Sequence, residues 1–184
     1  MLKKSRFFSA FLIALAFVIT VTTAVKLYAA YVGQPVASIQ LIDPSDNPKA
    51  IPYIGEKVVS IMYTDPDAKD VNDPLSDAIK AKNYSKAKYV AIGIANCKET
   101  YIPNGAIRYK TRQKAAQFPD AVFLLDEGRT LQNAWQLEGG NGAGIVILVG
   151  KDKKIKFLRK ITSQDQSRAA INDFLAALDA EVKK

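Results

Sequence analysis

Five short apolar runs constrain the fold more than any other feature of the chain. Each has the length of a buried strand, and segments with helical character lie between them. The runs are VVSIMY at 58–63, KYVAIGI at 88–94, AVFLLD at 121–126, IVILV at 145–149 and IKFLR at 155–159. Alternation of strands with helices predicts parallel pairing and helices on both faces of one sheet, whereas the turn sequence GKDKK predicts a hairpin between the last two runs.

Helical segments are predicted around these runs. The predicted helices cover 71–82, 106–118, 130–137 and the stretch that follows Ser163. Asp73 followed by Pro74 suits the start of the first of them, because aspartate caps well and proline fits the first helical position. Ser163 with Gln166 three residues later forms a capping box for the last helix. An early strand is expected within 35–43, before a turn-rich stretch.

The residue counts exclude most familiar catalytic chemistry. The chain has no histidine, which removes Ser-His-Asp triads, Cys-His pairs and almost every usual zinc site. It has one cysteine, Cys97, so neither an intrachain disulfide nor a Cys-x-x-Cys couple can form. We therefore expect neither a metal nor any other cofactor.

The first 30 residues have the features of an export signal. Three basic residues lie within the first six positions, and residues 7–25 carry no charge. Because an uncharged stretch of roughly 18 residues can also span a bilayer, an uncleaved anchor through 7–25 is the alternative. Both interpretations place the rest of the protein outside the cytoplasm, so we expect a periplasmic or exported protein, with a tether to the inner membrane left open. The predicted domains are a leader at 1–30 and one globular domain at 31–184.

The chain is only mildly basic once the leader is set aside. Four of the 26 basic residues lie in the leader, which leaves 22 against 18 acidic residues and a net charge of +4. This imbalance is small for a dedicated nucleic-acid binder, and we expect no nucleic-acid partner. Two basic runs, 108–114 and 151–160, are predicted to be solvated faces, with an anionic envelope surface as the functional alternative. On a helix, positions 108 and 112 form one stripe, and positions 110 and 114 form another.

Several short motifs follow one another in a specific order along the chain. They are AKDVN at 68–72, IAN at 94–96, IP at 102–103, AWQL at 134–137 and IVIL at 145–148. In order and spacing they resemble the YtfJ family. The stretches FPDAVFLLDEGRTLQNAWQL and IVILVGKDKKIKFLRK are also similar to the C-terminal half of peroxiredoxin and TlpA-type proteins. The resemblance implies an exported bacterial protein with an α/β thioredoxin-like fold, a three-layer sandwich with a central mixed sheet and helices on both faces. Members of this family usually lack a redox centre, and they have no established function.

The loop YTDPDAKD at 63–70 contains three aspartates, Asp65, Asp67 and Asp70. Counting from the aromatic end of the preceding strand places Asp67 to Asp70 where redox relatives hold Cys-x-x-Cys. We expect Asp67 to cap a helix with Asp70 at the third helical position, a variant capping box. Two alternatives stay open: a weak calcium site formed by all three carboxylates, although their spacing departs from the EF-hand, and a phosphatase with Asp65 as nucleophile and Asp67 as acid.

Cys97 and the glycine-rich loop EGGNGAG are the remaining candidates. Cys97 follows the second strand, departs from the pattern of the family, and has neither a histidine nor a second cysteine to activate or resolve it. We expect a free thiol, with a peroxidatic cysteine or an intermolecular disulfide as alternatives. The loop lacks the cis-proline with which thioredoxin-like relatives bind extended peptides. It is predicted to be a flexible connection, or else a backbone edge that binds a partner strand. The residues of that edge would be Gly140, Asn141, Gly142, Ala143 and Gly144.

Together these observations favour a non-redox binding or accessory module, and we expect no enzyme activity. Its partner would be a protein or peptide, or an anionic envelope surface. Trp135 is expected in the core instead of in a ligand-stacking role. The alternative functions are a thiol-dependent oxidoreductase or peroxidase that uses Cys97, and a phosphatase that uses Asp65 and Asp67.

Overall fold

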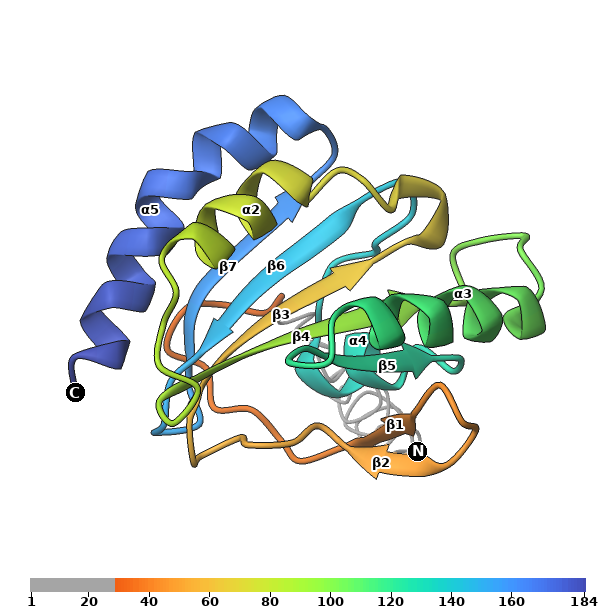
Figure 1. The fold of residues 1–184 in the computed structure, drawn as a ribbon, viewed down its shortest axis with the longest axis horizontal. Helices are drawn as coiled ribbons and strands as arrows, with labels where there is room; N and C mark the ends of the chain where they lie inside the picture. The colour runs from red at the N-terminus through yellow and green to blue at the C-terminus, as the bar shows by residue number, and fades with distance from the viewer. Residues whose placement is uncertain (1–28) are drawn as a thin grey trace, which may run out of the picture.

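The computed structural model describes residues 29–184 (Figure 1). The predicted leader at 1–30 lies outside the described residues except for its last two positions, and it stays a prediction. Within the described part of the chain, no helix combines the length and apolar character needed to cross a membrane.

Seven strands form one mixed sheet at the centre of the domain. Their bounds are β1 (Gln40–Ile42), β2 (Pro48–Ala50), β3 (Val58–Thr64), β4 (Tyr89–Asn96), β5 (Val122–Asp126), β6 (Gly144–Val149) and β7 (Ile155–Ile161). The order across the sheet is β2-β1-β5-β4-β3-β6-β7. β4 lies parallel to both β3 and β5, whereas β6 and β7 form the predicted antiparallel hairpin beside β3. The mixed sheet predicted from the alternation of strands and helices is confirmed.

Helices cover both faces of this sheet. They are α2 (Asp73–Ala81), α3 (Asn104–Gln117), α4 (Thr130–Trp135) and α5 (Gln164–Val182), and a short 3-10 turn, η2 (Pro66–Ala68), follows β3. In Figure 1, α2, α3 and α5 lie on the viewer's side of the sheet. Leu75 of α2 and Phe174 of α5 pack there against β3, β6 and β7. Trp135 of α4 packs with Ile61 of β3 on the opposite face, as predicted for a core tryptophan.

The N-terminal region differs most from the sequence-based expectation. The early strand is short, since β1 pairs over only 3 residues, and β2 occurs within the stretch that we expected to be turns. The Asp43 carboxylate accepts hydrogen bonds from the amides of Ser45 and Asn47, at 2.8 and 3.0 Å, and so closes the turn between the two strands. β2 begins with Pro48 and is exposed throughout, which suits an edge strand that pairs on one side only.

The last helix begins as predicted. The amide of Gln166 donates to Ser163 Oγ at 3.3 Å, which makes Ser163 the N-cap of α5. The reciprocal bond of the capping box is shifted by one residue, because Gln166 Oε1 accepts from the amide of Thr162 at 2.9 Å. The first turn of α5 is therefore satisfied by side chains from its own sequence.

A buried polar contact links the central strands at their carboxyl ends. The Tyr63 hydroxyl donates to Asp126 Oδ2 at 3.1 Å, and both side chains are fully buried. The Asp126 carboxylate also accepts the amides of Thr130 and Leu131, at 2.7 and 2.9 Å, and so holds the first turn of α4. Because a buried carboxylate is stable only when its oxygens are satisfied, this cluster fixes α4 against β3 and β5.

We predict that Tyr63→Phe destabilises the fold by about 1–2 kcal/mol, because it removes one donor from a buried carboxylate without leaving a large cavity. Urea denaturation followed by circular dichroism measures the change. Tyr84→Phe is the matched control, because the Tyr84 hydroxyl donates to Asp179 at the surface of the domain. Removing that hydroxyl should lower the free energy of unfolding by less than Tyr63→Phe does.

The buried phenol of Tyr63 should also make the stability of the fold depend on pH. Burial, followed by the charge of Asp126, raises the pKa of Tyr63 above its ordinary value, so the native state prefers the neutral phenol. Its stabilising contribution is then complete below the unfolded pKa of about 10 and is lost as the pH rises beyond it. Above pH 10, wild-type protein should lose stability more steeply than Tyr63→Phe. Equal slopes would contradict this role.

Candidate functional site

A groove of about 670 Å³ lies between α2 and α3. Its floor is the sheet face formed by Met62 of β3, Gly93 and Ala95 of β4 and Phe123 of β5. A Cβ at Gly93 would approach the Phe123 ring to 3.0 Å, so glycine at this position lets the ring lie across the floor. The volume falls within the range that small-molecule and peptide sites occupy.

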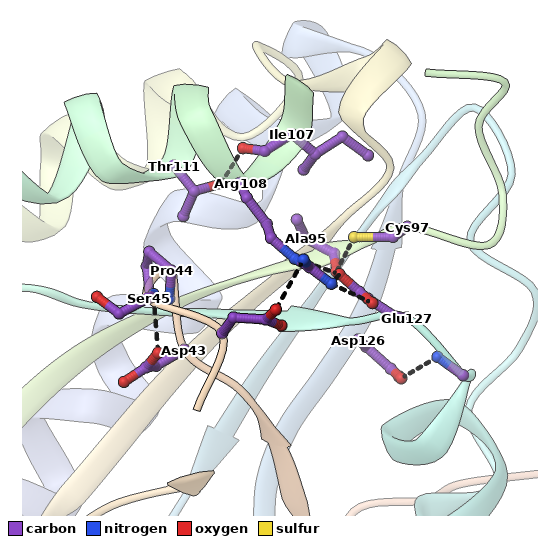
Figure 2. A network of polar contacts seen from close by, with 12 residues as sticks. Asp43, Pro44, Ser45, Ala95, Cys97, Ile107, Arg108, Thr111, Asp126 and Glu127 are labelled. Atoms are coloured by element: carbon purple, nitrogen blue, oxygen red, sulfur yellow. Dashed lines mark hydrogen bonds and ion pairs between the residues drawn. The ribbon is translucent and has the colours of Figure 1, made fainter. Parts of the chain in front are cut away.

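The groove exists because α3 packs loosely on the sheet. Ile107 is its single buried residue, and the helix has no apolar stripe that could close onto the floor. α3 is held instead by ion pairs at the edge of the sheet. Arg108 donates from Nε and Nη2 to the two carboxylate oxygens of Glu127, at 2.9 and 2.8 Å, and from Nη1 to Asp46 at 3.1 Å. Figure 2 shows this network, which joins α3 to the end of β5 and to the turn between β1 and β2.

The basic residues of α3 divide into two stripes, as predicted. Arg112 lies on the same side as Arg108, and its Nη1 donates to the carbonyl of Pro44 at 3.4 Å. Lys110 and Lys114 lie on the other side and line the groove. The first stripe therefore fastens the helix, whereas the second presents its charges to the cavity.

Asp65 is the aspartate of the 63–70 loop that the fold buries. Its side chain is 1% exposed, and its two oxygens accept the amides of Asp67 at 2.9 Å and Gly142 at 2.7 Å. Its own amide donates to the carbonyl of Ala143 at 3.0 Å. Asp65 thus caps η2 and ties the end of β3 to the glycine-rich loop.

The predicted capping box at Asp67 and Asp70 is wrong. η2 intervenes between the strand and the helix, Asp65 caps that turn, and α2 begins only at Asp73, with Asn72 as its N-cap. Asp67 and Asp70 are exposed, and Asp67 lines the end of the groove. Across residues 29–184, no three or more Asp, Glu, His or Cys side chains are grouped so that they could hold a metal ion, so the calcium alternative gains no support from the geometry.

The start of α2 has no amide available for an anion. Position 74 is proline, and the amides of Asp73 and Ser76 donate to backbone carbonyls of Asp70 and Asn72. The amide of Leu75 donates to Ser167 Oγ of α5 at 3.1 Å. An ionised thiol or phosphate at this helix start would therefore find its usual backbone donors already occupied.

Cys97 does not line the groove, and it packs with Ile107 and Leu125. It is 5% exposed, and its thiol donates to the carbonyl of Ala95 at 3.6 Å (Figure 2). Burial, together with the charges of Glu127 and Asp126, raises the pKa of the Cys97 thiol to about 12. A thiol in this environment stays protonated at neutral pH and is a poor nucleophile.

The glycine-rich loop is largely engaged within the fold. The Gly142 amide is held by Asp65, and the residue adopts a φ of 63°, which favours glycine. Ala143 O accepts from Asp65, and Gly144 lies in β6 between Thr64 of β3 and Ile161 of β7. Positions 142–144 therefore offer little free backbone for an added strand. Partner binding at Gly140 and Asn141 remains a prediction.

The second basic run lies on the hairpin and on β7, the last strand of the sheet. Lys156 pairs with Asp152 at 2.7 Å, and Arg159 pairs with Asp173 at 2.9 Å. Charged side chains on an outer strand also discourage pairing with other chains. Part of this basic charge is thus neutralised locally, and an anionic surface partner for this run stays a prediction.

Sequence reasoning missed the groove. The signal was present in α3, which carries four basic residues and almost no apolar periodicity. A helix with that composition cannot seal a sheet face, so a gap beneath it could have been expected. The contact of Ser167 with the start of α2 gave no such signal, because the Leu75 amide that it accepts is 92 residues away in sequence.

The topology and the layers are those of a thioredoxin-like protein, and solved structures agree. A hypothetical protein from Sinorhizobium meliloti matches with a TM-score of 0.62 at 13% identity, over 85% of this chain and 86% of its own. Peroxidoxin BcpB from Mycobacterium tuberculosis matches with 0.54 at 18% identity, over 83% and 98%. The thioredoxin domain of a thiol-disulfide oxidoreductase from Bacteroides vulgatus matches with 0.51 at 15% identity, over 79% and 99%. These likenesses show the shared fold.

Residues 54–176 match the family described as "Bacterial protein of unknown function (YtfJ_HI0045)", and the chain belongs to this family. An uncharacterized protein from Haemophilus influenzae is 29% identical over 94 residues, which are 50% of this chain and 50% of the relative. The match therefore spans about half the length of that relative. The resemblance drawn from the short motifs is confirmed.

We predict that Asp65→Ala destabilises the fold by about 1–3 kcal/mol, because two backbone amides lose their acceptor. Asp67→Ala, at an exposed neighbouring position, should change stability by less than about 0.5 kcal/mol. Thermal and urea denaturation of both variants measure the difference. Equal small effects would show that the Asp65 contacts contribute nothing to the fold.

We predict that native Cys97 is almost inert toward Ellman's reagent at pH 8. The folded thiol should react roughly a thousandfold more slowly than the same thiol in urea. Burial raises its pKa to about 12, whereas the pKa of an unfolded cysteine is near 8.5, so far less thiolate is present in the folded protein. Absorbance at 412 nm follows both reactions. Native labelling at the unfolded rate would contradict the burial of this thiol.

Proposed function

We propose that this chain is an exported thioredoxin-like protein that acts as a non-redox binding or accessory module, with the groove between α2 and α3 as its binding site. The observation that carries the proposal is the position of the groove. It opens at the carboxyl end of β3, beside the loop where thioredoxin-like redox proteins place their cysteines, and its lining residues include no cysteine.

The physical state of the candidate nucleophiles supports a binding function over catalysis. Cys97 is buried, its raised pKa keeps the thiol protonated at neutral pH, and it does not line the groove. Asp65 is 1% exposed and both of its oxygens accept backbone amides, so its carboxylate has a structural role and is poorly accessible to a substrate. Neither enzyme alternative gains support from a specific contact.

Activity assays on the mature domain, residues 31–184 without the predicted leader, test this proposal. We expect no insulin reduction with dithiothreitol and no peroxide consumption beyond the rate of Cys97→Ser, with a thioredoxin and a peroxiredoxin as positive controls. We also expect no hydrolysis of p-nitrophenyl phosphate with magnesium beyond the rate of Asp65→Asn. Turnover at an enzymatic rate that either substitution abolishes would overturn the proposal in favour of the corresponding enzyme.

A further inference from the structure

The two walls of the groove differ in charge. Lys110 and Lys114 lie one helical turn apart on α3, both are exposed, and across the described residues neither makes an ion pair. Asp67 and Asp73 lie on the opposite side, at the end of the groove next to α2. Partial burial and the charge of Asp70 raise the pKa of Asp73 above its ordinary value, and the charge of Lys114 opposes only part of this shift. A ligand therefore meets cations on one wall and hydrogen-bond acceptors on the other.

Asn72 closes the groove at the α2 end. It is 4% exposed, and its Nδ2 donates to Thr64 Oγ1 at 2.9 Å. Its amide oxygen is buried within the fold and is not presented to a ligand, so the acceptors at this end of the groove are the exposed carboxylates of Asp67 and Asp73.

Apolar surface lies between these polar ends. Met62, Phe123 and Ile107 form the base of the groove, and Ile102 lies at its margin. The neighbouring Tyr101 is fully exposed on the loop that leads into α3. Exposed aromatic side chains beside an apolar depression are typical of sites that anchor a protein partner.

We propose that the groove binds an extended peptide segment that carries an apolar side chain next to an acidic residue. The inference rests on the proposed binding function and gives its ligand class. The apolar side chain would rest on Phe123. A carboxylate would meet Lys110 and Lys114, and peptide N–H groups would face the acidic wall. A lipid headgroup layer fits less well, because Asp67 and Asp73 repel a continuous anionic surface at the other wall.

The test is a selection by the mature wild-type domain from a library of random heptapeptides displayed on phage, followed by fluorescence anisotropy of the selected peptides. We expect enrichment of peptides that combine Asp or Glu with an aromatic or branched aliphatic residue. Replacing the acidic residue of a selected peptide with its amide should weaken binding roughly tenfold, and added salt should weaken binding of the acidic form more than that of the amide form.

The double variant Lys110→Glu/Lys114→Glu should lose at least tenfold in affinity. The matched control Lys151→Glu/Lys154→Glu changes the net charge equally on the exposed hairpin and should bind as wild type. Circular dichroism and the melting temperature establish that both variants fold. Equal affinity of the two double variants would overturn the inference.

The remaining outcomes separate this inference from the proposed function. Enrichment of basic or purely apolar peptides, or of none, overturns the ligand class. Binding to phosphatidylglycerol vesicles without peptide binding replaces the peptide with a membrane surface and leaves a binding function in place. Turnover that depends on Cys97 or Asp65 overturns the binding function itself.

Discussion

The buried carboxylate of Asp65 determines how the chain leaves β3, and the geometry of the candidate site depends on it. One oxygen holds the amide of Asp67 in η2, and the other holds the amide of Gly142. A carboxylate in this environment remains stable because charge-assisted bonds from backbone amides replace the water that it has lost. The path into α2 and the path into β6 are thereby fixed by a single side chain, and the path into α2 lines the groove.

The groove is present because α3 is held to the sheet by ion pairs, whereas α2 and α5 are held by apolar packing. α2 and α5 cover the sheet with apolar side chains, and the side chains beneath them are buried. α3 is held at its outer side by Arg108, whose guanidinium forms a bidentate ion pair with the Glu127 carboxylate. Such a contact holds the helix in position without drawing its inner side onto the sheet, so Met62, Gly93 and Phe123 stay accessible from the groove.

The position that redox relatives use holds no cysteine, and the helix start that follows it has its amides occupied within the fold. Thiolates at a helix start are stabilised by free amides and by the helix dipole. In this chain Pro74 removes one amide, and Ser167 occupies another. The thiol of Cys97 is buried beside Ile107, and burial together with acidic neighbours disfavours its ionisation. The loop at 63–70 therefore supplies a structural cap and the end of a groove.

The sequence by itself determined most of the strands and helices and the excluded chemistry, but not β2 or η2. Apolar runs of strand length, Ser163 at the start of the last helix, and the lack of histidine and of paired cysteines were sufficient for a mixed α/β fold without a familiar catalytic centre. Tertiary structure decided which polar groups became buried acceptors and where the groove opened. Asp65 and Gly142 are 77 residues apart, and Leu75 and Ser167 are 92 apart. Local patterns report propensity and periodicity within a few turns of chain, whereas a hydrogen bond between distant segments exists only after the sheet has brought them together.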